Sequence, residues 1–247
     1  MLWQKERLLN LAVEALPTDC TKVAILDCDI LFGNEDWPEL TSRLLDRAAI
    51  AHLYSDMHYL PAGATSGSPG TTFAEPKRVS IIAAVLSGLD AEACLEAGNG
   101  PRAGKFGTGL AWGARRELLE RHSLYDAFIL GGADRAMLAG LYGCFDHLVR
   151  RHRLNDAELS HFKVWAEPFR QSVGGAIGFL EGDIFHLWHG ALADRRWYSR
   201  YEPMPRFQFN PFEDIGLTEH GLWRWNSDKP DLHAYVREHF VLRREDG

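Results

Sequence analysis

The sequence predicts an α/β fold in which helices flank a mixed β-sheet. A short apolar run at 23–26 has the character of a buried strand, and a helical pattern from Asp36 and a second strand-like run at 49–54 follow it. The order strand, helix, strand is typical of α/β proteins. The chain has 247 residues, of which 46% are apolar, so it can bury a sizeable core.

The first two elements are a helix and a strand that ends on acidic residues. Over residues 3–16 apolar side chains recur at helical spacing, and Pro17 ends the pattern. The run at 23–26 is continuous and lies between turn-forming residues, which is typical of a strand buried on both faces in a parallel or mixed sheet. It leads directly into Asp-Cys-Asp at 27–29.

Glycine-rich loops separate the later elements. Asp36 as N-cap and Pro38 in the first turn begin a helix, whereas residues 56–78 are rich in Gly, Pro, Ser and Thr and predict a long mobile loop that can act as a lid. The apolar stretch 79–95 fits either one helix or a strand followed by a helix. The remaining expected elements are a glycine-rich loop at 98–109, a strand at 110–112, helices at 115–121, after Gly132 and at 156–171, a strand at 183–188, an irregular tail from Tyr198 and a helix at 232–240.

Composition narrows the classes of partner. The formal net charge of −7 and the pI near 5.9 argue against general affinity for nucleic acid or an anionic membrane. The longest apolar stretch is about half of the ~20 residues that cross a bilayer, so no integral membrane segment is expected. Four widely spaced cysteines without a C-x-x-C pair predict the reduced thiols of a cytoplasmic protein.

Two acidic residues follow the first strand and are candidates for metal binding. Ligands of open α/β sheets gather at the carboxyl ends of strands, and period-two geometry would aim Asp27 and Asp29 in one direction. Two hard oxygen donors suit Mg²⁺ or Mn²⁺. Alternatively, Asp27 caps a turn and Asp29 is solvated.

Two histidines at the end of a later strand are further candidates. Within a regular strand His186 and His189 would face opposite sides, but a turn at the strand end can bring both to one ion. Imidazole favours Mn²⁺ over Mg²⁺. The alternative is that one or both rings are buried or hydrogen-bonded residues without a ligand.

A glycine turn precedes a third candidate carboxylate. Gly131 and Gly132 would let the backbone approach a bound sugar closely, and Asp134 can accept the proton of an attacking hydroxyl. Asp134 can equally serve as a helix N-cap. Of the aromatic side chains Trp112, close to the 107–109 turn, is the best candidate for stacking on a sugar ring, whereas core packing accounts for most of the others, which are Trp188, Trp197, Tyr198 and Tyr201. The basic run 150–153 is a candidate for a phosphate contact, but a solvated face is the better interpretation.

Five short motifs occur in a defined order. They are Trp-Gln-Lys-Glu-Arg-Leu-Leu-Asn at 3–10, Asp-Cys-Asp at 27–29, the segment 106–112, Gly-Gly-Ala-Asp at 131–134 and His-Leu-Trp-His at 186–189. Together they resemble the metal-dependent GT-A glycosyltransferases, especially bacterial family 2-like proteins and the β-1,4-galactosyltransferase and polypeptide N-acetylgalactosaminyltransferase group. The resemblance covers roughly residues 3–200, and it implies a nucleotide-sugar donor, a UDP-sugar foremost, and a glycan or other hydroxyl acceptor.

The resemblance also implies a role for each matched residue. Asp27 would touch the nucleotide ribose or hold a metal-bound water, and Lys5 would lie near the nucleotide. Asp134 would be the general base, in which case the transfer inverts the anomeric configuration. The implied ligands of Mn²⁺ or Mg²⁺ are Asp29, His186 and His189, with His189 preferred over His186.

Three features depart from the pattern. Ala133 stands where the family usually has Glu, which affects acceptor contacts, and Cys28 is an uncommon middle residue. GT-A enzymes place the D-x-D much further into the domain, so the first nucleotide-binding strands are expected to be lacking. We therefore expect an N-terminally shortened GT-A-like catalytic domain over residues 1–200 and an aromatic-rich extension packed on it over 201–247.

Two other classes remain open. A haloacid-dehalogenase-type phosphatase also begins with Asp-x-Asp after an apolar strand, but Leu31 stands where that family has Thr or Val, and no Gly-Asp-x-x-x-Asp motif occurs. The second alternative is a non-catalytic glycan-binding or interaction module derived from the GT-A fold. Metal-dependent nucleotide binding would distinguish a transferase from such a module.

Overall fold

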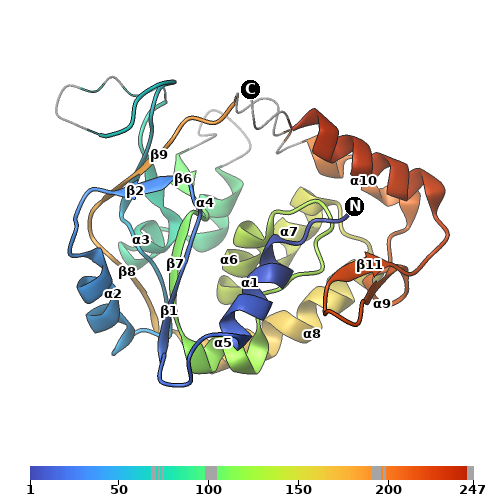
Figure 1. Ribbon diagram of the computed structural model, residues 1–247, viewed down its shortest axis with the longest axis horizontal. Coiled ribbons are helices and arrows are strands. Elements are labelled where there is room, and N and C mark those ends of the chain that lie inside the picture. Colours follow the sequence, from blue (N-terminus) through green and yellow to red (C-terminus); the bar gives the residue numbers. More distant parts are fainter. Residues whose placement is uncertain are drawn as a thin grey trace. The chain divides into compact units, whose positions relative to one another are not determined.

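The computed structural model describes residues 1–67, 71, 73, 75–97, 105–190, 196 and 199–243 (Figure 1). The chain forms two compact units, which we describe separately. The sheet unit consists of Leu16–Arg121 and Ser172–Trp188, and the helical unit consists of Met1–Ala15, His122–Gln171 and His189–Gly247. This division differs from the expected boundary at residue 200, because the N-terminal helix and the C-terminal region belong to the same unit.

The first sheet of the sheet unit is mixed and has the order β1-β7-β3-β8. Its strands are β1 (Lys22–Leu26), β7 (Ala111–Arg115), β3 (Ile50–His52) and β8 (Ile177–Phe179). β7 is antiparallel to both neighbours, whereas β3 and β8 are parallel. The mixed α/β class predicted from the sequence is therefore present.

A helix packs closely on this sheet. In α2 (Trp37–Leu45), the leucines at the C-terminal end are buried with Ala48 and Ala51. A Cβ added to Gly178 would lie 2.9 Å from the Leu44 side chain, and one added to Gly113 would lie 3.3 Å from that of Thr41. Both positions therefore need glycine for the close approach of helix and sheet.

The burial predicted for the first strand is wrong. β1 lies at the edge of its sheet and pairs only with β7 among the described strands, and the side chains of Ala24 and Leu26 are exposed. A continuous apolar run does not distinguish an edge strand from a central one, because exposed apolar residues are common on protein surfaces.

The second sheet has the order β2-β9-β4-β5-β6. β9 (Asp183–His186) lies between β2 (Ile30–Phe32), which is antiparallel to it, and β4 (Asp56–Tyr59), which is parallel. β5 (Arg78–Ser80) and β6 (Phe106–Gly107) complete it. Because β1 and β2 belong to different sheets, residues 27–29 form the connection that carries the chain from one sheet to the other.

Two expectations for this region change. The predicted loop 56–78 contains β4 and the first residue of β5, so only its middle lacks regular structure among the described residues. The stretch 79–95 forms the end of β5 and then α3 (Ile81–Leu86) and α4 (Ala91–Glu96). Ser80 and Asp90 cap these helices, and each side-chain oxygen accepts a hydrogen bond from a backbone N–H of the first turn.

The helical unit gathers helices from distant parts of the chain around one core. Asn10 in α1 (Lys5–Glu14) ties this helix to the segment after α5 (Arg116–His122): its Nδ2 donates to the Leu124 carbonyl at 3.0 Å, and its Oδ1 accepts from the Leu124 N–H at 2.8 Å. The other helices are α6 (Ala133–Tyr142), α7 (Phe145–His152), α8 (Asp156–Val173), α9 (Pro211–Asp214), α10 (Pro230–Leu242), η2 (Ser199–Tyr201) and η3 (Met204–Phe207). The core includes Phe128, Leu130, Ala136, Leu148, Phe162, Phe209, Leu232 and Val236.

The C-terminal tail is more regular than expected. Residues 199–225 contain η2, η3, α9 and a hairpin of β10 (Ile215–Leu217) and β11 (Trp223–Trp225). Across the described residues, no helix is both long enough and apolar enough to cross a membrane.

Candidate metal centre

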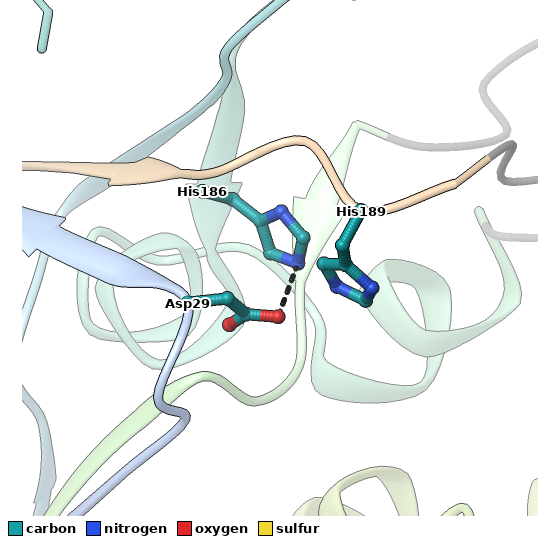
Figure 2. A group of neighbouring side chains, drawn as sticks. All are labelled: Asp29, His186 and His189. Carbon is teal, nitrogen blue, oxygen red and sulfur yellow. Dashed lines mark ion pairs between the residues drawn. The ribbon is translucent and has the colours of Figure 1, made fainter. Parts of the chain in front are cut away.

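Three of the predicted metal ligands lie together. The Asp29 carboxylate and the imidazoles of His186 and His189 each offer one ligand atom, and these atoms all lie within 4.8 Å of one another. Figure 2 shows the three side chains pointing toward one another, with Asp29 Oδ2 3.4 Å from His186 Nε2.

Strand pairing positions the first two ligands. Ile30 of β2 lies opposite His186, the last residue of β9, and the Leu187 N–H donates to the Asp29 carbonyl at 2.7 Å. Asp29 therefore lies beside the end of β9, and its carboxylate meets a His186 ring that is only 2% exposed.

The end of β9 brings in the third ligand. In a continued strand, residues three apart would point to opposite faces. β9 ends at His186, however, and the chain bends before His189, which directly follows Trp188, the last residue of the sheet unit. The His189 ring thereby returns toward the Asp29 carboxylate (Figure 2).

The donor set fits a divalent transition-metal ion. One carboxylate oxygen and two imidazole nitrogens bind Mn²⁺, Fe²⁺ and Zn²⁺ well, whereas Mg²⁺ prefers oxygen ligands alone. The atoms that bind one ion lie about 3 Å from one another, so small side-chain movements would bring the three ligand atoms into coordinating positions. Three protein ligands also leave coordination positions for a substrate.

Asp27 does not join this group. It follows β1, and its N–H donates to the Leu110 carbonyl at 2.8 Å. The period-two argument does not hold here, because Cys28 and Asp29 form a turn and do not continue the strand. Its two proposed roles, toward ribose or toward a metal-bound water, stay predictions.

The glycine turn of the helical unit is filled by the protein's own aromatic rings. Gly131 and Gly132 have φ values of +80° and +93°, a region that favours glycine. A Cβ on Gly131 would lie 3.0 Å from the Trp3 ring, and one on Gly132 would lie 2.7 Å from the Tyr201 hydroxyl, which donates to the Gly131 carbonyl. The space that we expected a sugar to use is therefore occupied.

Asp134 lies in the first turn of α6, and Gly132 is the N-cap of that helix. The alternative role of Asp134 as N-cap is therefore wrong.

Sequence reasoning missed a buried carboxyl group near Asp134. Glu6 in α1 is 6% exposed, and its Oε2 accepts a hydrogen bond from Trp3 Nε1 at 2.6 Å. Burial, and next the negative charge of Asp134, raise the pKa of Glu6 to about 7, while the neighbouring Lys5 opposes this rise. The signal in the sequence was Trp-x-x-Glu at the start of a helix, where residues three apart share a face.

Trp112 is not available as a stacking platform. Its ring is 2% exposed on β7 and packs edge-on against His52, with 4.1 Å between the ring centroids. Burial lowers the pKa of His52 to about 3. The ring belongs to the core because β7 is the strand between β1 and β3.

The other aromatic and basic candidates are divided between surface and core. Trp188 is 49% exposed, whereas Tyr201 is buried and stacks on His152 at 4.1 Å. The basic run 150–153 ends α7. Trp197 and Tyr198 lie outside the described residues.

Comparison with known proteins identified no relatives. No family model matches the chain, and neither a curated protein nor a solved structure is significantly similar to it.

Proposed function

We propose that the protein is a metal-dependent glycosyltransferase of the GT-A type, which binds Mn²⁺ through Asp29, His186 and His189. The observation that carries the proposal is the grouping of these three side chains within 4.8 Å. The order of the five sequence motifs and the mixed α/β sheets support it. The donor would be a nucleotide-diphosphate sugar, a UDP-sugar foremost, and the acceptor a hydroxyl of a glycan or another molecule.

Asp29 and His186 have different roles in the proposed metal centre. When bound, a divalent ion neutralises the negative charge that develops on a departing nucleotide diphosphate. Asp29 supplies one negative charge and leaves the centre with a net positive charge that attracts the diphosphate. His186 is held by its position at the end of β9, which keeps its ring oriented toward Asp29.

Asp134 is the proposed general base, which removes the proton from the acceptor hydroxyl as that oxygen attacks the anomeric carbon. This role and the nucleotide contact of Lys5 rest on the motif resemblance. Both residues belong to the helical unit, in which Glu6 is close enough to both for their charges to influence its pKa.

Titration calorimetry with Mn²⁺ tests the metal centre. Loss of a residue that merely supports a metal ligand costs about 10–100-fold in affinity, so Asp29→Ala and His189→Ala should each weaken Mn²⁺ binding by at least about a hundredfold. The matched control is Asp183→Ala, because Asp183 of β9 forms an Asp–His pair with His58 of β4 at 2.8 Å in the same sheet. Equal weakening by the control, or unchanged binding in Asp29→Ala, would refute the assignment.

Catalysis is tested separately. UDP release from a panel of UDP-sugars should depend on Mn²⁺ and fall with Asp29→Ala, and Asp134→Asn should abolish the acidic limb of the pH–rate profile, since a general base must be deprotonated to act. Glycan binding without nucleotide binding would instead favour the non-catalytic module. The phosphatase alternative remains disfavoured by Leu31, which stands where that family has Thr or Val.

A further inference from the structure

The sheet that carries His186 also carries an arginine on the same face. Tyr59 of β4 lies opposite His186 of β9, and Met57 of β4 lies opposite Arg78 of β5. Opposite residues of paired strands share a face, and so do residues two apart along a strand. His186, Tyr59 and Arg78 therefore point to the same side of the second sheet.

Side-chain contacts connect these three residues in a row. The rings of Tyr59 and His186 have centroids 5.0 Å apart, and the Arg78 guanidinium carbon lies 4.7 Å from the centre of the Tyr59 ring. Tyr59 is 7% exposed, so its position is fixed by packing. A guanidinium over an aromatic face gains a cation–π interaction, which holds the arginine within about 10 Å of the His186 ring.

The acidic side chains of these strands lie on the other face. Asp56 and Asp183 alternate with the residues named above, and each has a cationic neighbour: Lys77 Nζ lies 3.0 Å from Asp56, and His58 Nε2 lies 2.8 Å from Asp183. The face of Arg78 therefore combines a guanidinium with the candidate metal ligands, while these two carboxylates are directed away from it.

We propose that Arg78, held against the Tyr59 ring, binds a phosphate group of a diphosphate that also contacts the metal ion at Asp29, His186 and His189. A guanidinium matches phosphate oxygens in a bidentate geometry, and it remains charged at every physiological pH. A metal ion and an arginine a short distance apart suit an anion with two linked phosphates, of which each cation takes one. The inference rests on the proposed metal centre and extends it to a residue outside the sequence motifs.

Calorimetry with Mn²⁺, inorganic pyrophosphate and UDP tests this role. Arg78→Ala should bind Mn²⁺ as the wild type does, but its affinity for pyrophosphate and for UDP in the presence of Mn²⁺ should fall by about 10–100-fold, the loss that corresponds to one charged hydrogen-bonded pair. Arg78→Lys should recover part of this loss, because it keeps the charge without the bidentate geometry. Lys77→Ala is the matched control, since Lys77 is the adjacent cation on the opposite face.

Tyr59 gives a second, independent measurement. Tyr59→Phe keeps the aromatic face and should retain pyrophosphate binding, whereas Tyr59→Leu should weaken it several-fold because the guanidinium loses its support. Thermal unfolding verifies that each variant is folded, and Arg78→Gln replaces the alanine variant if the latter is unstable.

The outcomes separate the two proposals. A wild type that binds no Mn²⁺ overturns both. Intact Mn²⁺ binding with equal pyrophosphate affinity in wild type and Arg78→Ala overturns only the role of Arg78. Loss of pyrophosphate binding in Arg78→Ala, with no UDP binding in the wild type, supports the role of Arg78 and refutes a UDP-sugar as the donor.

Discussion

Glu6→Gln should stabilise the protein at alkaline pH and flatten its pH dependence. The buried carboxyl group of Glu6 has its pKa raised from 4.5 to about 7, first by burial and then by Asp134. Between these values the folded state binds more protons than the unfolded state, so stability falls as pH rises through this range. The pKa difference corresponds to about 3 kcal/mol at pH 8, of which the glutamine variant should recover most.

The substitution keeps the side-chain hydrogen bond with Trp3. The glutamine amide oxygen can still accept from Trp3 Nε1, which lies 2.6 Å from Glu6 Oε2. Because the neutral amide resembles the protonated carboxyl group, the variant should match the wild type at pH 4.5 and exceed it at pH 8.

Urea unfolding at pH 4.5, 6 and 8 measures the effect. Glu158 is a matched second position: its pKa is also raised to about 7 by burial, and its Oε2 accepts from the Asn155 N–H. Glu158→Gln should therefore give a similar gain, and the double variant should be nearly additive because the two residues lie on different helices. Parallel pH profiles for wild type and Glu6→Gln would show that Glu6 is ionised at its ordinary pKa and refute the reasoning.

Three further perturbations test the packing. Because burial lowers the pKa of His52 from 6.5 to about 3, the unfolded state binds a proton there more readily, and the stability that this residue contributes should be lost as pH drops below about 6.5. In urea titrations His52→Gln should therefore gain stability relative to the wild type as pH drops through this range. Gly132→Ala places a Cβ on left-handed backbone and against the Tyr201 hydroxyl, so it should lower the free energy of unfolding by about 2–4 kcal/mol. The control Gly63→Ala, with a φ of +81° but open space around it, should lower it by about 1 kcal/mol. Equal losses in the two variants would contradict the crowding by Tyr201. Asn10→Ala leaves the Leu124 N–H and carbonyl without this partner and should lower the free energy of unfolding by about 3 kcal/mol, while the exposed Leu8→Ala should change it by less than about 0.5 kcal/mol.

The candidate ligands could be found from the sequence because they adjoin strand ends. Asp29 follows an apolar run and His186 ends another, and ligand residues gather at such ends. The sequence did not indicate which strands pair, because the antiparallel pairing of β2 with β9 joins residues far apart in the chain. The residues of the candidate metal site could therefore be predicted from the sequence, but the strand pairing that brings Asp29 beside His186 could not.

Short strands and buried charges were harder to predict. β4 lies in a segment whose Gly and Pro content suggested only a loop, and its four residues, although they alternate polar and apolar, are too few to stand out from that segment. Glu6 has a polar side chain on a surface-like helix, and only tertiary packing buries it. Trp112 was assigned to a ligand because nothing local distinguishes a core tryptophan from an exposed one.

The way the chain divides between the two units affects how it can be synthesised and dissected. Each unit uses segments that are separated by the other, so neither is complete until at least residue 188 has left the ribosome. A fragment that ends near residue 121 would lack β8 and β9, the second of which carries His186. An isolated sheet unit therefore requires residue 121 to be joined to residue 172 by a linker, and deletion of the first 15 residues would remove α1 from the helical unit.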